Sequence, residues 1–432
     1  MYHTKRILAL VLCLLTVASL LFGCATSEAD YIPMASVPET EPTTEPTTAP
    51  TTEPTTEPPT TEPPTTEPQP ITYTLSFAGD CTLASDHNTY NAATGFIKVV
   101  GDKYDYPFQN ALPYFSNDDF TLVNLECVLS GKLTPVSKKF RFRGPVENVK
   151  MLTAGSIEAV NLANNHTKDY GNTGYKNTLE TLTNEKITYV ESFNTATYTT
   201  ASGLKIGLYA ATGNISTSDI KNDVKKLRDE GAQIVIASFH WGVEYSYRPN
   251  ATQKKIAHAA IDAGADIVVG HHPHVLQPVE KYGNGVIYYS LGNFCFGGNR
   301  NPDDKDTVLI QQLVIQDPDG TVRLGETKLI PFRVSSVTDK NDYKPTPLDP
   351  NDSAYKRVLS KLDGTFNGPD GNPNYDETTT APSTAPTTSP TNPTTPSTTP
   401  TQPTETPTEP STTPTTAPTE PTGSGGVSGD IF

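Results

Sequence analysis

Residues 267–274 read Ile-Val-Val-Gly-His-His-Pro-His, a short apolar run that passes directly into three histidines. β-Branched residues favour strands, so this run predicts a buried strand at 267–269 that ends at a polar cluster. Other predicted strands end in the same way, with Asp, Glu, Asn or His at or just after their last residue. Their ranges are 72–78, 120–125, 159–163, 234–239 and 286–291.

The order of the remaining patterns predicts the fold class. Helical patterns at 175–184, 218–229 and 252–263 alternate with the strands, which include one more at 205–210. Two later runs, 308–315 and 321–331, flank an Asp-Pro-Asp-Gly turn and predict an antiparallel pair. We therefore expect an α/β layered sandwich with a mixed sheet. The carboxyl ends of parallel strands line one crevice in such folds, so six polar strand ends predict a single site.

The chain has 432 residues, but its prolines are concentrated near both ends. Residues 25–70 hold 12 of the 39 prolines and residues 371–432 hold 13, in repeated Thr-Glu-Pro and Thr/Pro patterns. Such segments lack the apolar residues of a core, so we expect a disordered linker at 24–70 and a disordered tail at 377–432. Between them we expect one folded domain, 71–345, followed by a C-terminal extension, 346–376.

The first residues form a predicted export signal. Lys5 and Arg6 precede an apolar stretch, 7–21, which is too short to predict a spanning helix. It closes with Leu21-Phe22-Gly23-Cys24, which resembles the lipobox of bacterial lipoproteins. Cleavage after residue 23 would leave the Cys24 thiol to carry a diacylglycerol, which predicts an extracytoplasmic protein anchored to the cell membrane by lipid. An ordinary secretory signal is the alternative.

Three further cysteines, Cys81, Cys127 and Cys295, lie in or beside apolar strands. An odd number in this setting does not predict a disulfide framework, and we interpret them as small core residues. Cys81 and Cys127 each follow a candidate ligand, so strand alternation turns them away from the site.

The polar strand ends supply a mixed set of oxygen and nitrogen ligands. The candidates are Asp80, Glu126, Asn165, His240, His272 and His274. This mixture suits one or two divalent transition metal ions (Mn, Fe, Zn or Co) better than Ca or Mg, which prefer oxygen alone. Such ions polarise phosphoryl or carbonyl oxygens and generate hydroxide near neutral pH. His166 is placed to protonate a leaving group, and Asp169, three residues on, to orient it.

The charge balance bears on partners. Residues 71–370 carry 30 Lys and Arg against 33 Asp and Glu, without the basic surplus that nucleic acid binding needs.

Residues 138–143, however, hold four cationic side chains. As a strand with period two, this segment would place Lys139, Arg141 and Arg143 on one face, either as a charged edge strand or as a binding rim for an anionic substrate.

These motifs resemble those of the CapA family, whose members are associated with capsule and poly-γ-glutamate biosynthesis. The matching segments, over about 71–335, are Ser76-Phe-Ala-Gly-Asp80, Asn124-Leu-Glu126, Asn161-Leu-Ala-Asn-Asn-His166-Thr-Lys-Asp169-Tyr-Gly171, His240-Trp-Gly242, Gly270-His-His-Pro-His274-Val-Leu-Gln and Ser290-Leu-Gly-Asn-Phe294. The fold of the family resembles that of calcineurin-like metallophosphatases. The resemblance therefore implies a layered α-β-β-α sandwich.

The resemblance also implies a division of the ligands between two ions, with His166 as general acid. The first ion would be held by Asp80, Glu126 and His274, and the second by Glu126, Asn165, His240 and His272. His271 is either a further ligand or a hydrogen-bond partner of one.

One departure concerns the end of the first strand. The wider metallophosphatase pattern has Asp-x-His there, whereas this chain has Asp80-Cys81-Thr82. One ion is then a ligand short, and both Asp86 and His87 are candidates to replace it.

The resemblance implies a lipid-anchored, metal-dependent hydrolase acting in the biosynthesis or export of capsule or poly-γ-glutamate. Its expected partners are an anionic polymer or other envelope substrate, the membrane, and a capsule synthase complex. The alternative is a non-catalytic polymer-binding or scaffold subunit of such a complex on the same fold. The absence of a histidine at position 82 favours the scaffold function. The presence of His166 and Asp169 favours an enzyme, because a scaffold needs no general acid.

Overall fold

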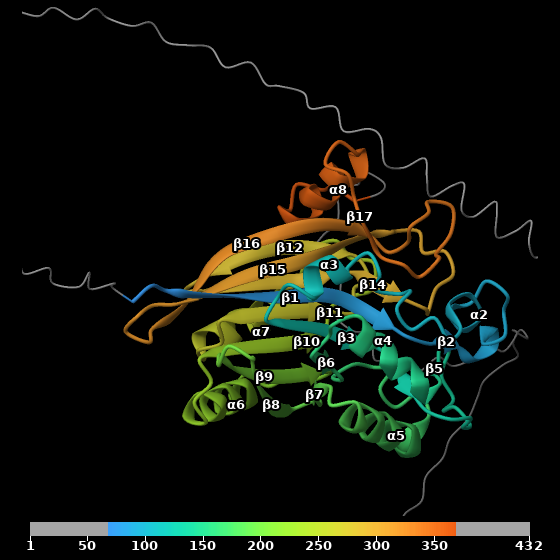
Figure 1. The fold of residues 1–432 in the computed structure, drawn as a ribbon, viewed down its shortest axis with the longest axis horizontal. Helices are drawn as coiled ribbons and strands as arrows, with labels where there is room; N and C mark the ends of the chain where they lie inside the picture. The colour runs from blue at the N-terminus through green and yellow to red at the C-terminus, as the bar shows by residue number, and fades with distance from the viewer. Residues whose placement is uncertain (1–67, 369–432) are drawn as a thin grey trace, which may run out of the picture. The chain divides into compact units, whose positions relative to one another are not determined.

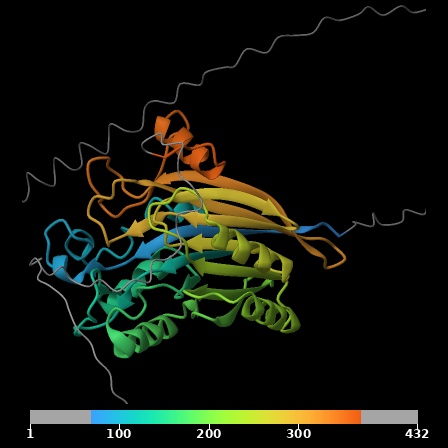
Figure 2. The ribbon, with the colours of Figure 1, turned by 180° about the vertical axis from the view of Figure 1, so that it is seen from behind.

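The computed structural model describes residues 68–368, which fold around two facing β-sheets (Figures 1 and 2). The predicted signal peptide with Cys24, the linker up to residue 67 and the 377–432 tail lie outside the described residues. Among the helices of 68–368, none has the length and apolar character required to cross a membrane.

The larger sheet has eight strands in the order β17-β16-β15-β1-β3-β6-β7, with β14 paired to β1 as well. Their bounds are β1 (Ile71–Thr82), β3 (Phe120–Leu125), β6 (Ala159–Asn161), β7 (Thr188–Val190), β14 (Asn293–Phe296), β15 (Asp306–Gln316), β16 (Val322–Arg333) and β17 (Thr346–Pro347). The series β1-β3-β6-β7 is parallel, whereas β15 pairs antiparallel with both β1 and β16. The predicted antiparallel pair is therefore confirmed.

The smaller sheet has six strands in the order β12-β13-β11-β10-β9-β8. Their bounds are β8 (Asn194–Thr199), β9 (Lys205–Thr212), β10 (Ile234–His240), β11 (Ile267–His271), β12 (Leu276–Tyr282) and β13 (Gly285–Leu291). The four central strands are parallel, and only the edge strands β8 and β12 are antiparallel. A small third sheet joins β2 (Ser85–Asp86), β5 (Phe142–Gly144) and β4 (Val128–Leu129).

Helices cover the outer face of each sheet. On the larger sheet they are α2 (Phe96–Val100), α3 (Leu112–Phe115), α4 (Lys150–Ala154) and α5 (Gly171–Asn184), with the short 3-10 turns η1 (His87–Thr89) and η2 (Val146–Val149) nearby. On the smaller sheet they are α6 (Thr217–Asp229) and α7 (Ala251–Asp262). Three apolar clusters lie between successive layers. The predicted α-β-β-α sandwich is confirmed.

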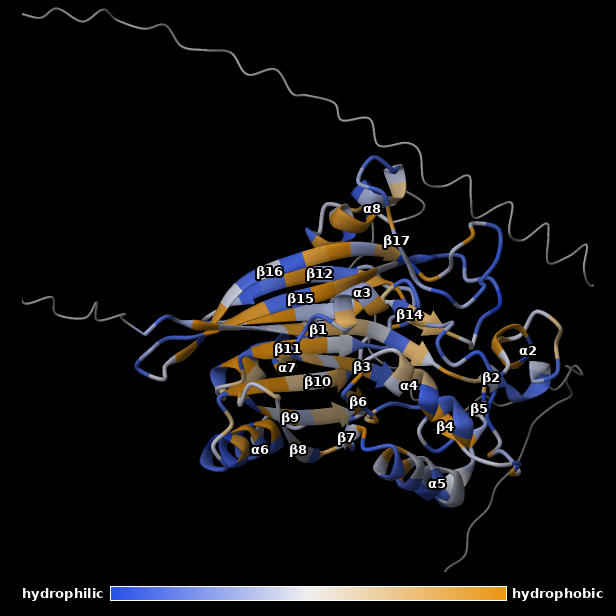
Figure 3. Ribbon diagram, in the orientation of Figure 1, coloured by the Kyte–Doolittle hydropathy of each residue, from blue (hydrophilic) through white to orange (hydrophobic). Residues whose placement is uncertain are grey.

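Strand alternation distributes side chains between these layers. Leu122 points into the cluster between the sheets, and its neighbour Val123 into the cluster under the helices. The parallel strand β10 is covered on both faces, and all seven of its residues are buried. Figure 3 shows the same arrangement, with apolar strands inside and hydrophilic helix surfaces outside.

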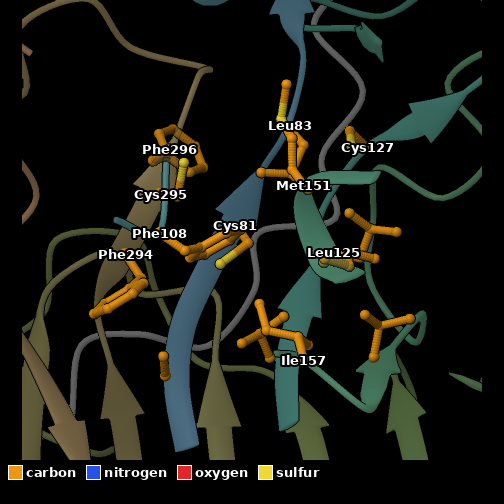
Figure 4. Close-up of a cluster of buried hydrophobic side chains, with 14 of the residues drawn as sticks. Cys81, Leu83, Phe108, Leu125, Cys127, Met151, Ile157, Phe294, Cys295 and Phe296 are labelled. Atoms are coloured by element: carbon orange, nitrogen blue, oxygen red, sulfur yellow. The ribbon is translucent and has the colours of Figure 1, made fainter. Parts of the chain in front are cut away.

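The cysteine prediction is confirmed for the described residues. Cys81, Cys127 and Cys295 are free, fully buried thiols within the cluster under the helices (Figure 4). Burial raises the pKa of Cys81 to about 12, so this thiol stays protonated beside the site. It is a packing residue.

The packed unit continues past residue 345. Helix α8 (Ser353–Leu362), at the top of Figure 1, packs on β12, β15 and β16 and adds Val358 to the cluster between the sheets. Its buried Lys361 Nζ lies 2.6 Å from Oδ2 of Asp304 and 2.8 Å from Oδ2 of Asp306. The first part of the predicted C-terminal extension therefore closes one end of the core.

The two sheets meet where β1 passes the turn after β13. The amide of Asp80 donates to the carbonyl of Gly292 at 2.9 Å. A Cβ at Gly79 would lie 2.0 Å from that carbonyl oxygen, so only glycine permits this approach. The junction sets Asp80, from the larger sheet, against residues that follow strands of the smaller one.

Candidate metal centre

The polar strand ends of both sheets come together, as the sequence predicts. Ligand atoms of Asp80, Glu126 and His274 all lie within 4.8 Å of one another. Asp80 is near the end of β1, Glu126 directly follows β3, and His274 lies in the loop between β11 and β12. These three are the residues that the family resemblance assigns to the first ion.

Asp80 is fully buried among donors. Its Oδ1 accepts from Asn124 Nδ2 at 2.8 Å and lies 3.3 Å from His271 Nδ1, while its Oδ2 lies 3.0 Å from His274 Nδ1. Burial alone would raise the pKa of Asp80, but the close imidazoles of His271 and His274 hold it well below its usual value. Burial likewise opposes the charge on His274, yet Glu126 and Asp80 raise its pKa to about 9.

Glu126 is fully buried, and its Oε1 has no hydrogen-bond partner within residues 68–368. Two imidazole nitrogens face that oxygen beyond hydrogen-bond distance, His240 Nε2 at 3.7 Å and His166 Nε2 at 3.9 Å. Burial, and next the charge of Asp80, raise the pKa of Glu126 well above its usual value. An unpartnered carboxylate oxygen in such a place is costly unless a cation joins it. The donor set therefore fits a metal.

The ligands assigned to the second ion are brought together only in part. Nε2 of His240 lies 3.1 Å from Oδ1 of Asn165, and the same nitrogen faces Glu126. The rings of His240 and His272 are 4.6 Å apart, but His272 groups with Glu244 and His274 instead. Burial, followed by the charge of His272, lowers the pKa of His240 well below its usual value, so its nitrogen is free to act as a ligand.

His166 and Asp169 form the pair that the sequence predicts. Nδ1 of His166 lies 2.6 Å from Oδ2 of Asp169, and both residues are buried. The other carboxylate oxygen accepts from Lys138 Nζ at 3.0 Å. Burial lowers the pKa of His166, against the opposing effect of the Asp169 carboxylate. The ring is thus held with Nε2 toward the carboxylate of Glu126.

Several residues of the centre had no predicted role, although Asn124 and Asn293 belong to the quoted motifs. Asn124 Nδ2 donates to Asp80, Asn293 Oδ1 lies 3.0 Å from His274 Nδ1, and the ring of Phe142 is 4.3 Å from that of His166. Strand alternation could have indicated Asn124, because it lies two residues before Glu126. Lys138, by contrast, carries no sequence signal that separates it from the next cation.

Neither candidate for the missing ligand replaces it. Asp86 accepts from the amides of Asn88 and Arg141, both at 2.9 Å. Nδ1 of His87 lies 3.4 Å from the hydroxyl of Tyr170. Both side chains are held by partners of their own.

The cationic run is not a strand over 138–143, because only its last two residues enter β5. Lys139 is exposed over the ring of Phe140, and Arg141 Nη2 donates to Asn88 Oδ1. Arg143 lies over the ring of Tyr90 and donates to the carbonyl of Ser130. Their role in binding an anionic substrate stays a prediction, and Lys138 is the cation of this run that contacts the site.

Two openings reach residues of the centre. A cleft of about 980 Å³ reaches His166, His274 and Asn293 and has aromatic walls that include Phe142 and Phe296. A second pocket of about 520 Å³ has mostly polar walls, and Asn165 is among its lining residues.

The fold and the site together define a layered α/β protein with a buried carboxylate and imidazole centre suited to a divalent metal. The family model described as "Bacterial capsule synthesis protein PGA_cap" matches residues 74–298. The chain belongs to this family, which confirms the resemblance seen in its motifs.

The names of similar curated proteins agree with this family assignment. The capsule biosynthesis protein CapA of Bacillus anthracis is 33% identical over 283 residues, which cover 57% of this chain and 68% of that protein. The PGA biosynthesis protein CapA of Bacillus subtilis (strain 168) is 32% identical over 284 residues, covering 60% and 71%. Among solved structures, Haemophilus influenzae NAD nucleotidase aligns with a TM-score of 0.35 and 13% identity, over 68% of this chain and 56% of that one.

Proposed function

We propose that this chain is a metal-dependent hydrolase that acts on an anionic polymer of the cell envelope during capsule or poly-γ-glutamate biosynthesis. The observation that supports hydrolysis is the buried His166–Asp169 pair, with Nε2 of His166 facing Glu126. Capsule biosynthesis follows from the family and from the names of the Bacillus relatives.

The residues that would hold the metal are Asp80, Glu126 and His274 for one ion, and Glu126, Asn165 and His240 for another. A divalent transition ion there supplies Lewis acidity toward a phosphoryl or carbonyl oxygen and lowers the pKa of bound water. Asn124 and Asn293 fix the ligands, because each amide contacts a carboxylate or imidazole of the centre.

His166 would move the proton. Asp169 accepts from Nδ1, so the nitrogen that exchanges a proton with the substrate is Nε2. Lys138 Nζ lies 3.0 Å from the other oxygen of Asp169 and forms an ion pair with it. The proton of Nε2 would pass to the leaving group, and Asp169 would stabilise the ring while it carries both protons.

The decisive experiment is an assay of the purified protein on poly-γ-glutamate and on a panel of phosphoesters. Protein stripped with chelator should be inactive, Mn²⁺ or Zn²⁺ should restore activity, and His166→Ala should stay inactive after the same addition. Chain shortening is measured by gel filtration and phosphate release by colorimetry. No turnover of any substrate under metal-replete conditions would contradict hydrolysis.

A scaffold subunit of a capsule synthase complex is the second candidate, and one observation favours it. Thr82, where the wider pattern has histidine, donates its hydroxyl to the carbonyl of Glu126 and cannot serve as that ligand. Polymer export by cells that carry His166→Ala distinguishes the hydrolase from the scaffold, because a scaffold with this substitution would still support export.

The lipid anchor on Cys24 and the extracytoplasmic location are also part of the proposal. They rest on the lipobox-like segment 21–24. Cys24→Ser should release the protein into the medium or leave it with an uncleaved signal, as measured by fractionation and mass spectrometry. A variant that is still processed and equally membrane-bound would contradict lipidation.

A further inference from the structure

We propose that Glu244 is a metal ligand, and that with His272 it forms an outer metal position facing the cleft, beside His274 of the inner one. This inference rests on the metal centre of the proposed function. It replaces the second-ion role that the family resemblance gives to His272, which the structure groups with Glu244 and not with Glu126.

The three side chains already converge. Ligand atoms of Glu244, His272 and His274 lie within 4.8 Å of one another. Nδ1 of His272 is buried and lacks a hydrogen-bond partner in the described part of the chain. A buried imidazole nitrogen with no donor or acceptor beside it is satisfied by an ion.

Local backbone structure holds this arrangement. Glu244 follows β10 in a turn whose next residue, Tyr245, donates its amide to the carbonyl of Pro273 at 2.8 Å. Tyr245, His272 and His274 all have positive φ angles, of 64°, 97° and 58°. Non-glycine residues adopt such angles at a cost, and they cluster where a side chain must be aimed at a ligand. The two turns are thus tied together with their side chains toward one point.

Glu244 differs from the carboxylates of the inner position in its exposure to the cleft. Glu244 is exposed and lines the cleft, whereas Asp80 and Glu126 are fully buried. The outer ion should therefore bind more weakly and exchange faster than the inner one.

The test is a titration of metal-free, full-length protein with Mn²⁺ or Zn²⁺ alone, followed by calorimetry and elemental analysis. Wild type should show the tight binding of the buried centre and, in addition, one weaker class of site. Glu244→Gln should weaken the lower-affinity class by about tenfold or more and leave the tighter class intact. His272→Ala should weaken the same class, and the double variant should add little to either single change.

Glu230→Gln, which alters an exposed carboxylate at the end of α6, is the control and should bind as wild type. A weaker class of site that is unchanged in Glu244→Gln, or the absence of that weaker class from wild type, would overturn this inference alone. Wild-type protein that binds neither ion would overturn the metal centre itself and with it the proposed function.

Discussion

Nδ1 of His274 lies 3.0 Å from Oδ2 of Asp80, although Asp80 belongs to the larger sheet and His274 follows a strand of the smaller one. The contact places a charged pair across the junction of the sheets, beside the close approach of Gly79 and Gly292. Occupation of the centre should therefore stabilise the packing of one sheet on the other.

Glu126→Gln should raise the melting temperature of metal-free protein and abolish most of the rise that added Mn²⁺ or Zn²⁺ causes in wild type. The buried, unpartnered carboxylate oxygen is costly without metal, and the neutral amide keeps its shape. Differential scanning fluorimetry with chelator and then with metal measures both effects. Glu147→Gln, at an exposed position in η2, is the control. An equal metal-induced rise in Glu126→Gln would show that Glu126 is not a ligand.

His166→Ala should leave metal content nearly unchanged and lower turnover by about 10²–10⁴-fold, the usual contribution of a general acid. Asp169→Asn should also lower turnover, because it removes the charge that orients the ring. Elemental analysis is compared with the rate on the best substrate found. Loss of metal from His166→Ala would instead make His166 a ligand.

Glu158→Gln should flatten the dependence of stability on pH. Burial raises the pKa of Glu158 to about 7, although its Oε2 accepts the amide of Thr121 at 2.7 Å. Between its unfolded and folded pKa values the folded state binds more protons, so this group lowers wild-type stability as pH rises from about 4.5 to about 7.

The measurement is the melting-temperature difference between wild type and Glu158→Gln at each pH. The melting temperature of wild type should fall relative to that of the variant as the pH rises from about 5 to about 8. Asp118, whose pKa burial raises to about 6, contributes in the same direction and stays in both proteins. A difference that does not change with pH would contradict the prediction.

Gly79→Ala should destabilise the fold by about 3 kcal/mol or more, because its Cβ would overlap the carbonyl of Gly292. Gly131→Ala is the matched control, since no heavy atom of the described chain lies within 4 Å of its added Cβ. Urea unfolding of the two variants measures the effect. Equal midpoints for both would mean that the junction of the sheets relaxes without cost.

The regular elements could be predicted because their signals are local. The strand expected at 120–125 is β3 without any shift, and the helix expected at 218–229 is α6 with one residue more. Period-two alternation and apolar helical spacing depend on neighbouring residues alone. The positions where strands end depend also on pairing with distant strands. Strand β1 continues four residues past the predicted end at 78, because it pairs there with β14.

The candidate site was predictable to the extent that it depends on strand ends. Asp80, Glu126 and His274 converge because parallel strands of each sheet end at the same edge, and the sequence shows which residues follow them. The cationic run had no such constraint, and Lys138 contacts Asp169 only because the loop before β5 folds over it.

The sequence by itself therefore determined the layered fold class, the family and most of the polar residues that meet at the centre, because strand patterns and motif order are properties of contiguous residues. Only the tertiary structure decided which of those residues face one another. It separates His272 from Glu126, joins it to Glu244, and leaves Asp86 and His87 with partners of their own. Such pairings depend on how turns from different strands are aimed across the junction of two sheets, and no spacing along the chain encodes that direction.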